Sequence, residues 1–166
     1  MRRCETAQSR RRSGRGLAVL ALALLGASAT DPDARTLAVE QDGSGDYSVI
    51  QDAVDAAAPG DTILIGPGEY LESTVVEFDP GTFGETFVFV TTPGLTILGR
   101  DRDTVIIGPR EQDWDDENFA PQGIAVSAAS PVGISFGNLT LRNLKEASRT
   151  AGPSKVENVL FIDSQK

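Results

Sequence analysis

The sequence predicts an all-β fold, a solenoid of short stacked strands closed at its N-terminal end by one short amphipathic helix. Short β-rich runs separated by Gly, Pro, Asn or Asp fill the chain after residue 61, and no second helical pattern follows. Without further helices, the crossovers of a doubly wound sheet are missing. A weak 20-residue repeat places "GNLTLRN" (137–143) over "ENVLFIDS" (157–164), and this period is typical of a β-solenoid. An antiparallel sandwich is the alternative, because its strands recur at a similar spacing.

The capping helix is predicted to occupy about ten residues between Ser48 and Pro59. Ser48 and Gln51 have the S-x-x-Q spacing of a capping box, in which the two residues cap the helix reciprocally. Pro59-Gly60 is expected to end the helix. A helix this short is stable only when docked, so its apolar stripe is expected to cover the open end of the stacked strands. The stripe has i, i+3, i+4, i+7 spacing and consists of Ile50, Ala53, Val54 and Ala57.

The predicted strands are rich in β-branched and aromatic residues and are bounded by turn residues. The first strand is expected at 36–41. The turn "DGSGD" (42–46) follows, and its Asp42, Ser44 and Asp46 are interpreted as turn and helix-entry residues rather than as a cation site. The remaining predicted strands are 62–65, 73–78, 86–90, 95–98, 104–108, 123–127, 132–136, 139–141 and 158–162.

The first 29 residues are predicted to be a secretory signal peptide, cleaved near Ala29. Leu17–Leu25 is apolar but shorter than the ~20 residues that span a bilayer, and Ala27–Ala29 has the A-x-A pattern of a cleavage site. The protein is therefore expected to be secreted or periplasmic. Ser9-Arg10-Arg11 resembles a twin-arginine signal without its following Phe and Leu, so both export routes stay open. The basic n-region consists of Arg2, Arg3, Arg10, Arg11, Arg12 and Arg15.

The charge balance limits the partners. Six of the 15 basic residues and one of the 24 acidic residues lie in residues 1–29, which leaves a net charge near −14 on the remainder. A field of this sign repels nucleic acid and anionic lipid, so neither nucleic acid nor a membrane is expected as a partner after cleavage. It also disfavours polyanionic sugars, unless a local basic patch or a cation intervenes.

The residue types present exclude several kinds of catalysis. The only cysteine, Cys4, lies in the predicted signal peptide, and the chain has no histidine. A mature protein of this composition has no disulfide and no thiol nucleophile. Ser-His-Asp and Cys-His catalysis and His-ligated zinc are excluded within the chain. Carboxylates, Arg, Lys, Gln, Asn and hydroxyl groups remain for chemistry, and no cofactor is expected.

The stretch "VEQDGSGDYSVIQDAVDAAAPGDTILIGPGEYLES" (39–73), continued by "LTILGRDRDTVIIG" (95–108), resembles a known fold family. It looks like the N-terminal coils of right-handed parallel β-helix proteins of the pectin-lyase-like superfold. Within these it is similar to pectinesterases, which begin with a D-G-S-G-D-Y segment and an I-Q-x-A-V-D-A-A helix. The resemblance covers residues 38–108, and residues 123–166 only as generic coils. It implies a right-handed parallel β-helix capped by its first helix.

The resemblance carries few functional residues. Pectinesterases place two Asp carboxylates, an Arg and Gln side chains in segments similar to Q-D-T-L and D-F-I-F-G, and neither segment occurs here. "TAGPSK" (150–155) is similar to the T-A-G-P segment before the first catalytic coil of that family. However, "VENV" (156–159) stands in place of its Gln-bearing continuation. No catalytic, cofactor-binding or metal-binding residue is assigned on this basis.

Two weaker site candidates remain. The acidic loop 111–119 could hold Ca²⁺ or stack a sugar ring, although it lacks the central Gly of a calcium loop, and a solvated loop is the favoured interpretation. Asn138-Leu139-Thr140 is formally a glycosylation sequon. Because Asn138 repeats as Asn158, we interpret it instead as an inward turn residue that hydrogen-bonds along the stack. The loop candidates are Asp113, Trp114, Asp115, Asp116 and Glu117.

Two hypotheses on function follow. The first is a secreted β-helix module that binds or organises extracellular polysaccharide without catalysis in this segment. The second is a pectinesterase-like or related polysaccharide-active enzyme, in which one Asp attacks an ester carbonyl and a protonated Asp assists. The discriminating feature is an Asp pair with an Arg on one exposed face. The sequence does not show it, so the first hypothesis is favoured.

The chain is expected to be incomplete. "VENVLFIDSQK" (156–166) has the alternation of a new strand, and no capping segment follows it. Because natural solenoids cap both ends, further coils of about 20 residues are expected downstream of Lys166. Under the second hypothesis, the catalytic coils lie there. A partner chain that continues the stack is the alternative.

Overall fold

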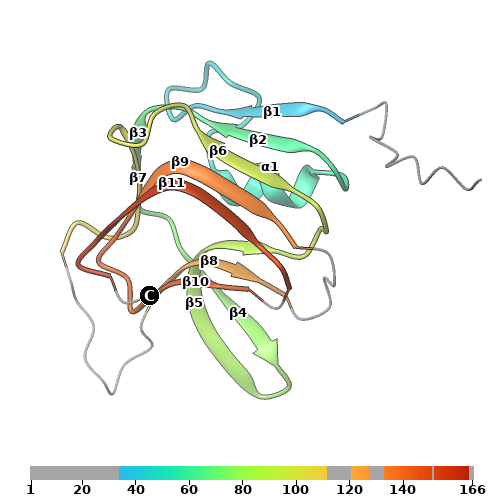
Figure 1. The fold of residues 1–166 in the computed structure, drawn as a ribbon, viewed down its shortest axis with the longest axis vertical. Helices are drawn as coiled ribbons and strands as arrows, with labels where there is room; N and C mark the ends of the chain where they lie inside the picture. The colour runs from blue at the N-terminus through green and yellow to red at the C-terminus, as the bar shows by residue number, and fades with distance from the viewer. Residues whose placement is uncertain (1–33, 112–120, 128–132, 151, 165–166) are drawn as a thin grey trace, which may run out of the picture.

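The computed structural model describes residues 34–111, 121–127, 133–150 and 152–164 (Figure 1). The predicted signal peptide lies outside these residues. Within them, no helix is long and apolar enough to cross a bilayer. The described elements, in chain order, are β1 (Thr36–Val39), α1 (Ile50–Ala56), β2 (Thr62–Ile65), β3 (Gly68–Tyr70), β4 (Thr74–Asp79), β5 (Thr82–Val90), β6 (Thr96–Gly99), β7 (Val105–Ile107), β8 (Gln122–Val126), β9 (Ser135–Arg142), β10 (Glu146–Arg149) and β11 (Lys155–Ile162).

The strands form two sheets with mainly parallel pairing. The larger sheet has the order β1-β2-β6-β9-β7-β3, with β11 also paired to β9, and the smaller has the order β10-β8-β5-β4. In Figure 1, β1, β2, β6, β9 and β11 follow one another down the molecule, and the β4–β5 hairpin projects beyond the body. This hairpin is the one antiparallel pair among the described strands. The predicted all-β class is confirmed, and the pairing is not that of an antiparallel sandwich.

Equivalent residues of the larger sheet lie in rows that cross its strands. Apolar side chains on one face of successive strands are buried, and they form a continuous part of the core. Residues on the alternate positions face outward and are partly exposed. One buried row consists of Leu37, Ile63, Ile97 and Phe136, and the outward row beside it consists of Thr36, Thr62, Thr96, Ser135 and Lys155.

The predicted strands mostly match the structure, although β5 begins at Thr82 and β11 at Lys155, three or four residues before the predicted starts. Three further differences concern which strands form. Residues 135–136 of the predicted strand 132–136 and the whole predicted strand 139–141 lie in one continuous strand, β9, because left-handed Asn138 bends the chain without ending the pairing. The strands β3 and β10 were not predicted, since their sequences "GEY" and "EASR" lack an apolar run.

Asn138 and Asn158 form a polar ladder between neighbouring strands. Both have left-handed backbone conformations, with φ of 54° and 52°. The Asn158 Nδ2 donates to the Asn138 Oδ1 at 2.9 Å, so the predicted hydrogen bond along the stack is confirmed. The predicted inward orientation is wrong, because Asn138 is half-buried and Asn158 is exposed. The backbone bend turns each amide toward the next strand rather than toward the core. Asn143 and Asp163 repeat the left-handed conformation at the same 20-residue spacing.

Replacing Asn138 with Ala is expected to lower the free energy of unfolding by about 1–2 kcal/mol, because Ala resists positive φ. Asn138→Gly is expected to cost less, since Gly adopts this conformation without a Cβ clash. Urea unfolding of both variants measures the difference. If Gly is as destabilising as Ala, the lost side-chain hydrogen bond, rather than backbone strain, explains the effect.

The helix α1 confirms the predicted apolar stripe and corrects its capping. Ile50, Ala53, Val54 and Ala57 are all buried. The helix spans Ile50–Ala56, shorter than predicted, and its N-cap is Val49, with no side-chain capping bond. The predicted capping box is therefore wrong. The Gln51 side chain instead accepts a hydrogen bond from the backbone N–H of Phe89 and donates one to its carbonyl, which ties the helix to β5.

Candidate functional site

The acidic loop singled out in the sequence is not tested by the structure. Asp113, Trp114, Asp115, Asp116 and Glu117 lie outside the part of the chain that the structure describes. In that part, no group of three or more Asp or Glu side chains is placed to hold a metal ion.

The turn at 42–46 has the structural role that the sequence predicts. The Asp42 carboxylate accepts hydrogen bonds from the Ser44 N–H and hydroxyl, which lower the Asp42 pKa. The Asp46 carboxylate accepts from the Ala38 N–H at 2.8 Å. The Asp42 carboxylate therefore stabilises the turn itself, and the Asp46 carboxylate joins the turn to β1.

An open groove of about 260 Å³ crosses the outward face of the larger sheet and is named the outer groove. Its base is on β9, where Ser135 and Gly137 are the outward residues. Larger side chains from β6 and β11 flank it on either side, because the strands pair in register. The flanking side chains are Thr96 and Leu98 on β6 and Lys155 and Glu157 on β11.

Gly137 keeps the outer groove hollow. A Cβ at this position would lie 2.3 Å from the Glu157 carbonyl oxygen, so any larger residue forces the backbone of β9 and β11 apart. Ser135 is the next smallest outward residue of the strand. The groove is therefore hollow because Ser135 and Gly137 on β9 are small, whereas their partners 20 positions later on β11, Lys155 and Glu157, are larger.

The groove is lined by hydroxyl groups and one exposed ion pair. Thr96 and Ser135 belong to the outward hydroxyl row that continues to Thr62 and Thr36. Lys155 Nζ lies 2.9 Å from the Glu157 carboxylate, and both side chains are 67% exposed. An ion pair this exposed contributes little to stability, so both groups can turn to a ligand at small cost.

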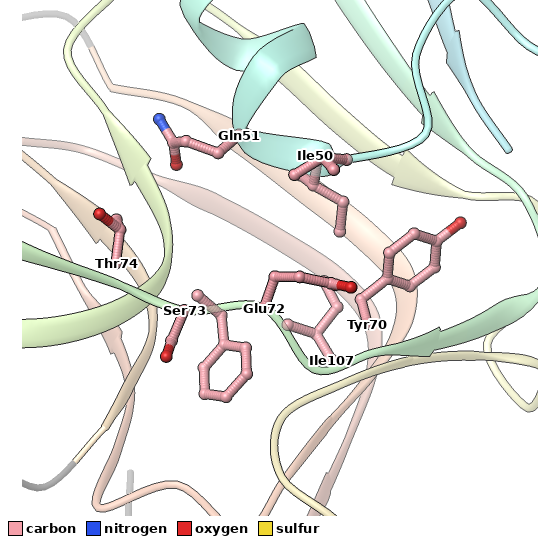
Figure 2. Close-up of a pocket in the computed structure, with 9 residues that line it drawn as sticks. Ile50, Gln51, Tyr70, Glu72, Ser73, Thr74 and Ile107 are labelled. Carbon is pink, nitrogen blue, oxygen red and sulfur yellow. The ribbon is translucent and has the colours of Figure 1, made fainter. Parts of the chain in front are cut away.

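A second hollow, of about 90 Å³, lies beside the first turn of α1 and is named the helix pocket (Figure 2). Its floor is apolar and comes from α1, β3, β5 and β7. Its rim comes from the segment that joins β3 to β4. The floor consists of Val49, Ile50, Tyr70, Phe87 and Ile107, and the polar residues are Gln51, Glu72, Ser73 and Thr74.

Tyr70 anchors the floor of the helix pocket. Its hydroxyl donates to the Gly66 carbonyl at 2.9 Å, and its side chain is 2% exposed. Burial raises the Tyr70 pKa to about 12, and the negative charges of Glu40 and Glu72 add to this effect. The phenol therefore stays protonated in the physiological pH range and acts as a packing and hydrogen-bonding group.

A polar cluster joins the strands β3 and β9 to the segment that follows β7. The Glu69 carboxylate accepts from Arg142 at 2.9 Å and from Arg110 at 2.7 Å, and these two guanidinium groups lower its pKa. Arg142 Nε also donates to the Pro109 carbonyl, and the Asn143 amide donates to the same oxygen. Because its charges are largely paired with one another, we interpret this cluster as structural.

The three described carboxyl groups whose pKa departs from its usual range do not resemble a general acid. The pKa values of Asp42, Asp61 and Glu69 all lie below their usual range. An acid catalyst at neutral pH needs a raised pKa.

Neither a scan against protein-family models nor a search of curated proteins finds a match to this chain. The site assignment therefore rests on geometry and residue chemistry.

The sequence prediction did not find the outer groove or the helix pocket. The groove had a usable signal, because the 20-residue repeat that aligns Asn138 with Asn158 also aligns Ser135 with Lys155. The helix pocket had no such signal, since its residues come from separate segments between positions 49 and 107.

Proposed function

We propose that this chain is a secreted right-handed parallel β-helix module of the pectin-lyase-like type that binds extracellular polysaccharide along the outer groove. The coil geometry is supported by the pairing of β9. The first half of β9 pairs with β6 and the second half pairs with β7. The strand β9 therefore lies beside both strands of the preceding strand–turn–strand unit. The parallel pairing of β11 with β9 at a 20-residue offset repeats the arrangement.

The observation that carries the binding proposal is the hydroxyl-lined groove that crosses the strands. Equivalent side chains on neighbouring strands lie about 4.8 Å apart, close to the rise of one sugar ring in an extended polysaccharide. Successive sugars can therefore meet equivalent hydroxyl groups. Leu98 supplies an apolar surface for the carbon face of a ring, while Lys155 and Glu157 supply a donor and an acceptor. The negative net charge favours a neutral or methyl-esterified polymer over a polyanion.

Filling the outer groove is expected to abolish binding. Ser135→Phe places a large side chain in its base, and we expect affinity for the bound polysaccharide to fall by about tenfold or more. Affinity electrophoresis in gels that contain galactomannan, xyloglucan, methylated pectin or polygalacturonate identifies the polymer and measures the loss. Thr36→Phe is the matched control, because Thr36 is an exposed residue of the same outward row, three strands away.

Several outcomes contradict the proposal. Equal retardation of the Ser135→Phe and Thr36→Phe variants removes the groove as the binding site, and no retardation by any polymer removes the binding function. Methanol release from methylated pectin by the purified chain favours the esterase hypothesis instead.

A further inference from the structure

The helix pocket lies away from the outer groove and has an unfilled apolar floor. Ile50, Phe87 and Ile107 are each at most 6% exposed, and the ring of Tyr70 closes the inner side. Figure 2 shows Ile50, Tyr70 and Ile107 gathered beside the first turn of α1. A hollow with such a floor favours an apolar group of a few carbon atoms.

The polar groups of the helix pocket are mostly used within the protein. The Gln51 amide bonds to the Phe89 backbone, the Tyr70 hydroxyl donates to the Gly66 carbonyl, and the Ser73 hydroxyl donates to the Glu85 carboxylate. Among the described residues, no hydrogen bond or ion pair engages the Glu72 carboxylate. In Figure 2 this carboxylate extends toward the Tyr70 ring. The polar groups left for a ligand among the described lining residues are therefore the Thr74 hydroxyl and the negatively charged Glu72 carboxylate.

The charges around the pocket have one sign. Of the described residues that line it, none is Lys or Arg, and Glu85 and Asp55 bond to pocket residues from the side. The raised pKa of Tyr70 reflects, besides burial, the negative charges of Glu72 at the rim and of Glu40, which is paired with Arg100 and does not line the pocket. The first turn of α1 adds a partial positive charge, which Asp52 in that turn offsets.

We propose that the helix pocket binds a small organic cation, an ammonium group on a short apolar chain. The ammonium group pairs with the exposed Glu72 carboxylate at the rim, and the chain lies over the accessible edges of Ile50 and Phe87. The ion pair favours a cation over a neutral or anionic ligand of the same size. This proposal does not depend on polysaccharide binding at the outer groove.

Three probes of equal chain length test the charge preference: n-butylammonium, n-butanol and butyrate. Saturation-transfer NMR and calorimetric titration with the purified chain are expected to give n-butylammonium the highest affinity and butyrate the lowest. Glu72→Gln is expected to lower the affinity for n-butylammonium about tenfold and to leave the affinity for n-butanol unchanged. Glu77→Gln is the matched control, because it removes the same charge from the β4–β5 hairpin outside the pocket and is expected to change neither affinity.

A second variant tests the floor. Val49→Phe adds bulk at the half-buried N-cap of α1, and it is expected to weaken the binding of both n-butylammonium and n-butanol. The proposal is overturned if none of the three probes binds, or if butyrate binds as tightly as n-butylammonium. Equal n-butylammonium affinities for Glu72→Gln and Glu77→Gln also overturn it.

Discussion

Replacing Val54 with Asp is expected to prevent soluble folding or to lower the free energy of unfolding by about 3–5 kcal/mol. Val54 is 2% exposed and lies on the buried stripe of α1, which packs against β1, β2 and β5. An Asp there is buried with no basic residue on the stripe to pair with it. Domains of this size are stable by about 5–15 kcal/mol, so this loss is a large fraction of the total. Soluble yield and the midpoint of urea unfolding measure it.

Ala56→Asp is the matched control for this variant. It introduces the same side chain two residues later in the same helix, at an exposed position. We expect a loss below about 1 kcal/mol, from a negative charge near the helix C-terminus. Equal losses for Val54→Asp and Ala56→Asp contradict the assignment of the buried face of α1.

The features that the sequence predicted correctly are those with a local period. The predicted stripe has three residues in α1, namely Ile50, Ala53 and Val54, and all three are buried. The fourth, Ala57, is also buried, but it is the C-cap of the helix with an extended backbone. The strand β2 is predicted at the positions where it occurs, because a β-rich run lies between turn residues. In these elements a single face meets the core, so local pattern and burial agree.

The errors arise where a distant residue decides the outcome. Gln51 has the spacing of a capping box, yet its amide bonds to Phe89, 38 residues away, because β5 brings an unpaired backbone N–H and carbonyl to the helix. The strand β10 has a polar sequence, and it forms because Glu146–Arg149 lies in register with β8. Neither contact follows from residues nearby in the chain.

The outer groove and the helix pocket differ in the same way, because one depends on a sequence pattern and the other on contacts between distant segments. The outer groove depends on a repeat that is visible in the sequence, so its position follows once the strands are aligned by Asn138 and Asn158. The helix pocket depends on how α1 sits over β3 and β5. Its volume is set by packing between segments with no sequence relationship, which single-sequence patterns do not encode.

Asp61 is the buried charge on which the N-terminal end of the fold depends most. Its side chain is 1% exposed, and its Oδ1 accepts from the Arg35 N–H at 2.8 Å. Its Oδ2 accepts from the Ala58 N–H at 2.9 Å and from the Arg35 guanidinium at 2.8 Å. The carboxylate thus joins the end of α1 to the start of β1. The backbone N–H groups of Arg35 and Ala58, with the Arg35 side chain, lower the Asp61 pKa to about 2.

Asp61→Asn is expected to lower the free energy of unfolding at pH 7 by about 3 kcal/mol, because the amide loses the charge and turns an N–H toward groups that are themselves donors. The folded-state pKa of Asp61 lies below the usual value of 3.8, so its contribution is complete above about pH 4 and is lost as the pH falls toward 2. The difference between wild type and Asp61→Asn is therefore expected to narrow over this window. Urea unfolding at pH 7, 4, 3 and 2.5 measures it.

Asp103→Asn, at a 68% exposed carboxylate paired with Arg102, is the control and is expected to cost below about 1 kcal/mol at every pH. A difference between wild type and Asp61→Asn that stays constant from pH 4 to 2.5 contradicts the charged role of Asp61, and leaves its shape as the cause.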